Sequence, residues 1–184
     1  MRVISGSARG LKLKSPKGMD VRPTTDRVKE SVFNIINNRL IDSFVLDIFS
    51  GTGSLGIEAL SRGAQKCTFI DSSKESIKVI KENIEKARVN DKSEVILSDA
   101  ISAINKLGVR RDKFDIIFMD PPYLKNLIEP VLEEISKKNI LEEDGIIIVE
   151  HDTKDELLEE INNLYKYREK KYGNTTISFF ALEE

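Results

Sequence analysis

The sequence predicts an α/β protein with a doubly wound, mostly parallel sheet that ends in an antiparallel hairpin. From residue 43 onward, short apolar runs alternate with amphipathic stretches. Near-continuous apolar strands that alternate with helices are typical of parallel sheets covered on both faces. Near the end of the chain, two strand-like runs flank Gly173-Asn174, a dipeptide that suits a tight hairpin.

The order of the elements follows from the period of their apolar residues. Short apolar runs predict strands over residues 43–49, 66–71, 93–98, 114–120 and 145–150. Residues 165–172 and 175–182, on either side of Gly173-Asn174, bring the predicted strands to seven. Apolar residues spaced three and four apart predict helices over residues 26–40, 54–62, 74–89, 100–107, 124–138 and 154–164. In residues 1–18, two short apolar segments flank a turn rich in Gly, Ser and Ala, which favours a further hairpin.

Composition narrows the class of protein. The 184 residues include one Cys and one His, which excludes a disulfide framework, Cys-based zinc sites and His-rich metal sites, so we expect no metal. No apolar run approaches the ~20 residues of a membrane span, and basic residues interrupt the start of the chain. We therefore expect a cytoplasmic protein, and we expect a monomer because nothing in the sequence indicates an oligomer.

The net charge of −2 is unevenly distributed along the chain. Residues 1–42 contain nine Lys and Arg against four Asp and Glu, a charge of +5. Residues 43–184 contain 20 against 27, a charge of −7. We interpret residues 1–42 as a basic N-terminal extension and residues 43–184 as the catalytic domain, the two forming one compact unit.

The first predicted strand leads into a glycine-rich loop. Gly51, Gly53 and Gly56 satisfy G-x-G-x-x-G, and Asp71 follows 20 residues after Gly51 at the end of the second strand. Such glycines allow the backbone to approach a nucleotide, and the acid can accept hydrogen bonds from ribose hydroxyls. A carboxylate at Asp47 would repel a pyrophosphate but suits a cofactor with an ammonium group. This favours S-adenosylmethionine over a dinucleotide.

The third predicted strand ends in Ser98-Asp99-Ala100. A carboxylate at this point can accept a hydrogen bond from the adenine amino group. Asp is also a good N-cap, so Asp99 can equally begin the helix over residues 100–107. Both interpretations remain open at this point.

The fourth predicted strand runs into Asp120-Pro121-Pro122-Tyr123. Two prolines make the chain rigid and remove two backbone donors, which leaves the Asp120 carboxylate and the Pro121 carbonyl as acceptors. An exocyclic base amine donates two hydrogen bonds, so two acceptors can hold it with its lone pair toward an electrophile. Tyr123 can stack on the base. The same residues could instead form a rigid loop that only leads into the next helix.

Together these segments resemble the S-adenosylmethionine-dependent methyltransferases that act on exocyclic amines, which have a Rossmann-like, seven-stranded sheet with a terminal antiparallel hairpin. The N-terminal segment resembles one family in particular, the RsmD family, which methylates guanine N2 in 16S ribosomal RNA. The matching segments are Arg9-Gly10-Leu11-Lys12-Leu13, Pro16, Gly18 and the run from Arg22 to Asn34, which begins Arg-Pro-Thr-Thr-Asp.

The resemblance assigns roles to particular residues. It implies that Asp120, Pro121, Pro122 and Tyr123 hold the target guanine. It implies cofactor contacts from the glycine loop, from the ends of the second and third strands, and from the N-terminal segment: Asp47, Phe49, Ser50, Gly51, Gly53, Asp71, Ser72, Asp99, Ala100, Arg22 and Thr24. The implied partner is 16S ribosomal RNA, within the small ribosomal subunit or an assembly intermediate.

The basic N-terminal extension supplies candidate RNA contacts, Arg9, Lys12, Lys14, Arg22 and Arg27. Contacts of such side chains with phosphates give affinity, whereas contacts with base edges give sequence choice. The target base would have to lie in a loop or be flipped out. The alternative is a solvated hairpin and helix face, on which Arg27 and Lys29 simply face water.

Other functions account for fewer of the motifs. An adenine-N6 DNA methyltransferase would use Asp-Pro-Pro-Tyr equally well, but the chain shows no additional target-recognition domain. A nicotinamide-dependent oxidoreductase would leave Asp47 and that tetrad unexplained, and an inactive RNA-binding module would not need the chemical positions. We expect Cys67 to be a core residue and His151 to be an exposed residue at a strand end.

Overall fold

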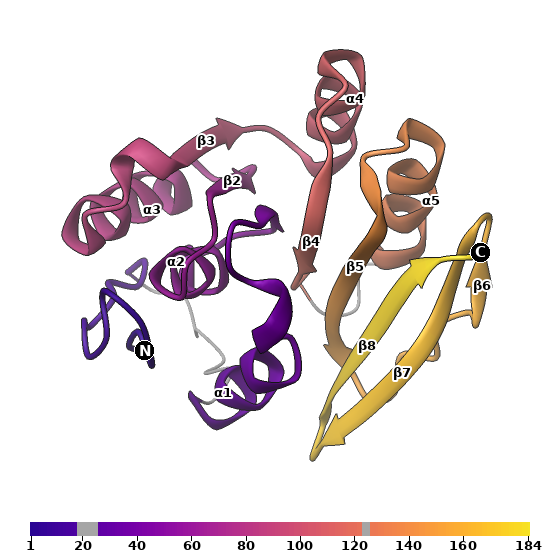
Figure 1. The fold of residues 1–184 in the computed structure, drawn as a ribbon, viewed down its shortest axis with the longest axis horizontal. Helices are drawn as coiled ribbons and strands as arrows, with labels where there is room; N and C mark the ends of the chain where they lie inside the picture. Colours follow the sequence, from indigo (N-terminus) through magenta and orange to yellow (C-terminus); the bar gives the residue numbers. More distant parts are fainter. Residues whose placement is uncertain (18–25, 123–125) are drawn as a thin grey trace.

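The computed structural model describes residues 1–17, 26–122 and 126–184. Within these residues, eight strands form one sheet in the order β3-β2-β1-β4-β5-β8-β7-β6 (Figure 1). The strands are β1 Phe44–Ile48, β2 Lys66–Asp71, β3 Ser93–Leu97, β4 Phe114–Met119, β5 Leu141–Asp152, β6 Glu160–Ile161, β7 Leu164–Tyr172 and β8 Thr175–Leu182. The helices are α1 Asp26–Ile35, α2 Ser54–Ser61, α3 Lys74–Ala87, α4 Ala100–Arg110 and α5 Ile128–Lys138, with 3-10 turns at Asn37–Arg39 and Asn90–Lys92.

The predicted α/β class is confirmed. Strands β1 to β5 pair in parallel, and β8 pairs antiparallel with both β5 and β7. Along β4, Ile116 and Phe118 join the apolar cluster beneath α1, α2 and α3, whereas Ile117 and Met119 join the cluster beneath α4 and α5. Both faces of the sheet are therefore covered, as Figure 1 shows.

The structure differs from the sequence prediction at the predicted helix over residues 154–164. That prediction is wrong: the segment is a turn followed by β6, a two-residue strand that adds an eighth member to the seven predicted strands. Ile161 pairs with Leu164 across Asn162 and Asn163, and Asn162 has a φ of 52°. Asn tolerates this left-handed conformation, so a tight hairpin replaces the helix. The helix predicted over residues 26–40 ends at Ile35 and continues as a 3-10 turn.

The glycine at position 56 sets the distance between α2 and the sheet. A Cβ at Gly56 would lie 2.4 Å from the Phe69 ring and 2.6 Å from the Cys67 sulfur. Only glycine therefore allows α2 to pack this closely on β2, which places the start of the helix next to the loop after β1. Cys67 is fully buried in this core, as predicted.

The first residues of the chain form an arm that packs on α2. An antiparallel bridge joins Arg2 to Lys12, and the Val3 amide donates to the Leu11 carbonyl at 2.9 Å, so the predicted hairpin is reduced to a single bridge. The Glu58 carboxylate on α2 accepts from the amides of Ile4 at 2.8 Å and Ser5 at 3.1 Å.

The alternative in which Lys29 faces water is wrong. Its side chain is 1% exposed, and its ammonium group lies 3.2 Å from the Glu58 carboxylate. The same ammonium group donates to the Arg2 carbonyl at 2.7 Å, and Arg62 contacts the second Glu58 oxygen at 3.1 Å. A fully buried carboxylate thus connects the arm, α1 and α2.

Candidate active site

The loop between β1 and α2 is a tight turn held by serine. The Ser50 hydroxyl donates to the Asp47 carbonyl at 2.6 Å and accepts from the Ile70 amide at 3.1 Å. Phe49, Gly51 and Gly53 have φ values of 59°, 59° and 79°, a conformation that is costly for Phe and free for Gly. A Cβ at Gly51 would meet nothing within 4 Å, so the backbone there faces open space.

Asp47 lies at the bottom of this turn. Its side chain is 1% exposed, and one carboxyl oxygen accepts from the Gly56 amide at 3.1 Å. Burial raises the pKa of Asp47 to about 8, although the Gly56 hydrogen bond lowers it. A cation placed beside this carboxyl group would restore its charge.

Asp71 ends β2 directly opposite the glycine loop. One carboxylate oxygen accepts from the Gly51 amide at 2.9 Å, and the other accepts from the Ser73 amide at 2.9 Å. Each oxygen therefore has one backbone donor and retains a lone pair for a hydroxyl group. The adjacent Ser72 is exposed.

Asp99 serves as the N-cap of α4. Its carboxylate accepts from the Ser102 amide at 2.9 Å, and this hydrogen bond lowers the pKa of Asp99. The capping interpretation is therefore confirmed, while the side chain stays exposed at the edge where β3 ends. Ala100 is buried beneath it.

Asn83 on α3 links this loop to the N-terminal arm. Its amide group donates to the Thr52 carbonyl at 2.8 Å and to the Lys14 carbonyl at 3.0 Å, while its oxygen accepts from the Lys14 amide at 2.8 Å. The side chain is fully buried. The glycine loop and the arm are thus held by the same residue.

The end of β4 lies beside the end of β1. Ile48 is aligned with Met119 in the parallel pair, so the glycine loop and Asp120 leave the sheet as neighbours. Asp120 is half-buried, Pro121 is buried and Pro122 is exposed. Tyr123 lies outside the described residues, as do Arg22 and Thr24.

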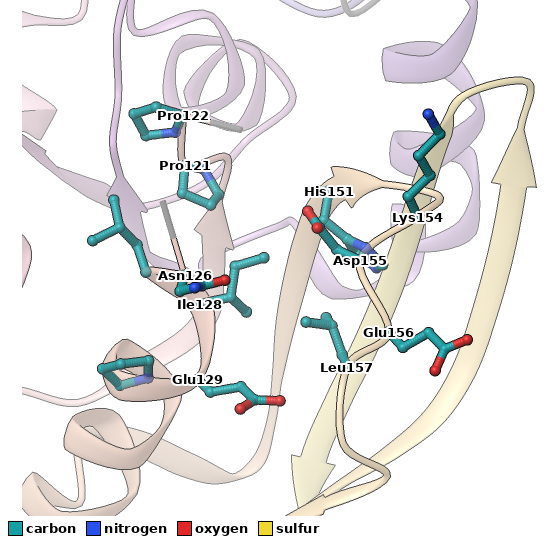
Figure 2. Close-up of a pocket in the computed structure, with 12 residues that line it drawn as sticks. Pro121, Pro122, Asn126, Ile128, Glu129, His151, Lys154, Asp155, Glu156 and Leu157 are labelled. Carbon is teal, nitrogen blue, oxygen red and sulfur yellow. The ribbon is translucent and has the colours of Figure 1, made fainter. Parts of the chain in front are cut away.

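A cavity of about 510 Å³ opens next to Pro121 and Pro122 (Figure 2). The first residues of α5 line one side of it, and His151 and residues 154–157 line another. The expectation that His151 is exposed is wrong: its side chain is 2% exposed, and its Nε2 lies 2.8 Å from the Ser178 hydroxyl. Burial lowers the pKa of His151, so its ring is neutral near pH 7.

The residues of this second wall were missed by the sequence reasoning. Asp155 and Leu157 belong to the segment predicted as a helix over residues 154–164. Glu129, on the α5 side of the cavity, belongs to the helix predicted over residues 124–138 and was not singled out. The sequence signal against a helix there is the pair Asn162-Asn163, which favours a hairpin turn. With a turn at this point, the residues before it are too few for the predicted helix.

Three of the four described RNA-contact candidates, Arg9, Lys12 and Arg27, are exposed. Arg9 and Arg27 line one hollow of about 380 Å³ together with Arg2, although they are far apart in the sequence, and two acids, Asp26 and Glu30, line the same hollow. Lys12 is exposed on the arm. Lys14 pairs with Glu82 at 2.7 Å, so its charge is partly neutralised.

The described residues contain neither a candidate metal cluster nor a helix that could span a membrane. In residues 1–17, 26–122 and 126–184, no group of three or more His, Cys, Asp or Glu side chains could hold a metal ion. No helix in this part of the chain has the length and apolar character needed to cross a membrane.

A parallel sheet with β8 inserted antiparallel between β5 and β7, together with a glycine loop after β1, defines the fold of the S-adenosylmethionine-dependent methyltransferases. The chain belongs to the family described as "Conserved hypothetical protein 95", whose model matches residues 1–181.

Curated relatives cover almost the whole chain. It is 41% identical over 180 residues to "Putative rRNA methyltransferase YlbH" from Bacillus subtilis, covering 98% of both chains. It is 35% identical over 173 residues to "Ribosomal RNA small subunit methyltransferase D" from Haemophilus influenzae, covering 94% of this chain and 89% of the relative.

Solved structures show the same fold. The "Putative methyltransferase yhhF from Escherichia coli" has a TM-score of 0.88 and 32% identity, covering 100% of this chain and 98% of that one. A structure described as "SMU.776, a putative methyltransferase complexed with SAH" has a TM-score of 0.70 at 16% identity, covering 86% of this chain and 49% of that one. At this lower identity the likeness concerns the fold alone.

Proposed function

We propose that this protein transfers a methyl group from S-adenosylmethionine to the exocyclic N2 amine of a guanine in small-subunit ribosomal RNA. The observation that carries the proposal is the position of Asp120-Pro121-Pro122 at the end of β4, beside the glycine loop that follows β1. A cofactor site and an amine-binding site thereby share one edge of the sheet, next to a cavity.

The loop residues fit S-adenosylmethionine. Asp47 is a buried carboxyl group whose pKa is raised to about 8, so it gains a favourable partner from an ammonium group. Asp71 is held by two backbone amides with lone pairs available for ribose hydroxyls. Asp99, exposed at the end of β3, can accept a hydrogen bond from the adenine amine while it caps α4. A cofactor that contains phosphate would instead bring negative charge to Asp47 and oppose the ionisation of its carboxyl group.

The cofactor supplies a methyl group on a positively charged sulfur, an electrophile that an amine nitrogen can attack directly. The chain itself contributes position. We assign the Asp120 carboxylate and the Pro121 carbonyl to the two hydrogens of the guanine amine, which turns its lone pair toward the cofactor loop. Such positioning of two reactants accounts for large rate enhancements without a covalent enzyme intermediate.

The ribosomal RNA partner rests on the relatives and on the basic surface. Both curated relatives described above carry rRNA or ribosomal RNA methyltransferase names. On the chain itself, Arg2, Arg9 and Arg27 line one hollow on the arm and α1. Asp26 and Glu30 line it too, so the three guanidinium groups leave the hollow with a small positive excess for contacts with phosphates. Lys12 extends this surface along the arm.

The proposal is tested by incubating the protein with labelled S-adenosylmethionine and small ribosomal subunits that lack base methylation, followed by nucleoside analysis. Label in N2-methylguanine is expected. Label in N6-methyladenine would contradict the assigned base, and the absence of any transfer to RNA would contradict the assigned polymer. The variant Asp120→Ala should abolish transfer while calorimetry shows S-adenosylhomocysteine affinity within a few-fold of the wild type.

A further inference from the structure

The cavity beside Pro121 is large enough for a nucleobase and is bounded by two different elements. Its volume of about 510 Å³ is in the range of small-molecule sites. One wall is Pro121 and Pro122 at the end of β4, and the opposite wall is the loop of residues 152–157 (Figure 2). A base whose amine is held at Asp120 would extend into this space.

The loop of residues 152–157 is held in place by its own hydrogen bonds. The Asp152 carboxylate accepts from the Lys154 amide at 2.9 Å, and its carbonyl accepts from the Asp155 amide at 2.9 Å. The Thr153 amide donates to the Asn174 carbonyl at 2.9 Å, which ties the loop to the β7–β8 hairpin. A side chain at position 155 is therefore presented from a fixed backbone.

Three carboxylates line the cavity, and only one is suited to a ligand. Glu129 on α5 accepts from the Leu158 amide at 3.3 Å, so it holds the end of the loop. In Figure 2 the side chains of Lys154 and Glu156 are directed away from the cavity. The Asp155 carboxylate is directed into it. No hydrogen bond or ion pair engages the Asp155 carboxylate among the described residues.

Guanine and adenine differ in what they offer to such a carboxylate. Guanine N1 carries a hydrogen and donates, whereas adenine N1 has a lone pair and accepts. An ionised carboxylate only accepts, so it pairs with guanine N1–H and is repelled by adenine N1. A site that pairs with a polar group of its substrate rejects analogues that lack that group.

We infer that this cavity binds the target guanine and that the Asp155 carboxylate accepts its N1–H, which makes Asp155 the residue that selects guanine over adenine. The inference rests on the proposed function, since it presupposes that guanine N2 is the acceptor of the methyl group. It adds a second contact, across the cavity from Pro121 and Pro122, so that the base is held at both its N1 and its N2 positions.

The test uses 2-aminopurine, which has the same N2 amine as guanine but no hydrogen on N1. The target guanine is first mapped in transcribed 16S ribosomal RNA assembled with small-subunit proteins, and 2-aminopurine is then placed at that nucleotide by ligation. Single-turnover transfer to each base is measured for the wild type, Asp155→Ala, Asp155→Asn and Glu156→Ala. The last variant is the matched control, since it removes the same charge from the same loop.

The wild type should methylate guanine faster than 2-aminopurine by roughly 10- to 100-fold. Asp155→Ala should lose most of this preference, chiefly through slower transfer to guanine, and Asp155→Asn, which keeps an acceptor, should lose less. Glu156→Ala should keep the wild-type preference. Calorimetry with S-adenosylhomocysteine should give unchanged affinity for all variants, which shows that each is folded.

An unchanged preference in both Asp155 variants, with guanine still methylated at N2, would overturn the role of Asp155 and leave the proposed function standing. A wild type that methylates no guanine at N2 would instead overturn the proposed function. If Asp155→Ala does not bind S-adenosylhomocysteine, it is not folded, and the base preference of Asp155→Asn alone tests the role of Asp155.

Discussion

Replacement of Glu58 by Gln should destabilise the whole protein, because Glu58 is the buried carboxylate that holds the arm and α1 on α2. It is 0% exposed and accepts from the amides of Ile4 and Ser5. It also pairs with Lys29 at 3.2 Å and Arg62 at 3.1 Å. Gln keeps the size of the side chain but removes the charge, and its amide hydrogens would face groups that are themselves donors.

The magnitude follows from the burial of the ion pair. Removal of one partner from a buried pair costs about 3–5 kcal/mol, since the other charge is left uncompensated. For a chain of this length, 1 kcal/mol corresponds to about 2–4 °C in melting temperature, so we expect a decrease of roughly 6–20 °C. Burial already lowers the pKa of Lys29, and Glu58 opposes that effect. In the variant, folding therefore favours neutral Lys29, so the loss of stability should diminish as the pH rises.

Thermal denaturation measures the loss of stability in Glu58→Gln, and limited trypsin digestion shows which part of the chain becomes accessible. In Glu58→Gln, cleavage at Arg9 and Lys12 on the arm should accelerate. The exposed pair between Lys14 and Glu82 supplies the control, and Glu82→Gln should change the melting temperature little. The double variant Glu58→Gln with Lys29→Met should recover part of the loss, since it removes the stranded cation. A melting temperature within about 2 °C of the wild type for Glu58→Gln would refute the reasoning.

Three further outcomes are expected. Binding of S-adenosylhomocysteine near pH 7 should release about one proton, because burial raises the pKa of Asp47 to about 8 and the ammonium group restores its charge. Calorimetry in buffers of different ionisation enthalpy measures this release, which should fall to about half near pH 8, fade at higher pH and be absent in Asp47→Asn. Gly56→Ala should lower the free energy of unfolding by about 1–3 kcal/mol in urea denaturation, because its Cβ would lie 2.4 Å from the Phe69 ring; a neutral effect would contradict this packing. Asn83→Ala should speed hydrogen exchange of the Lys14 amide by roughly tenfold or more, and unchanged protection would show that the amide is held otherwise.

The sequence was sufficient for the centre of the sheet because β1, β2, β4 and the second half of β5 are buried and contain short apolar runs. The largely exposed β7 was located instead by the Gly173-Asn174 turn that follows it. The glycine loop and Asp71 were found for a similar reason, since their spacing reflects a local strand–turn–helix unit. The helix predicted over residues 154–164 failed because its contacts are not local: Leu158 bonds to Glu129 on α5, and Lys166 on β7 bonds to Glu159. Apolar periodicity cannot report such contacts.

The burial of Lys29 and His151 was missed on the same grounds. Each polar side chain is buried beside a partner that is distant in the sequence, Glu58 for Lys29 and Ser178 for His151. The sequence around a Lys on an amphipathic helix does not show that a carboxylate on another helix will pair with it. Buried polar residues are therefore where sequence patterns fail most, and in this chain one of them lines the cavity beside Pro121.

The contacts of the N-terminal extension show which of its basic side chains are already paired with carboxylates. Among its basic residues, Lys29 is buried in an ion pair with Glu58, and Lys14 forms an ion pair with Glu82. The positive charge of each is therefore at least partly neutralised within the protein. Among the others, Arg2, Arg9 and Arg27 line one hollow together with Asp26 and Glu30, and Lys12 is exposed on the arm. Glu58 of the acidic body thus anchors the arm that carries Arg2 and Arg9. Arg9→Ala should accordingly weaken RNA binding and its salt dependence more than Lys14→Ala, which filter binding at several salt concentrations can decide.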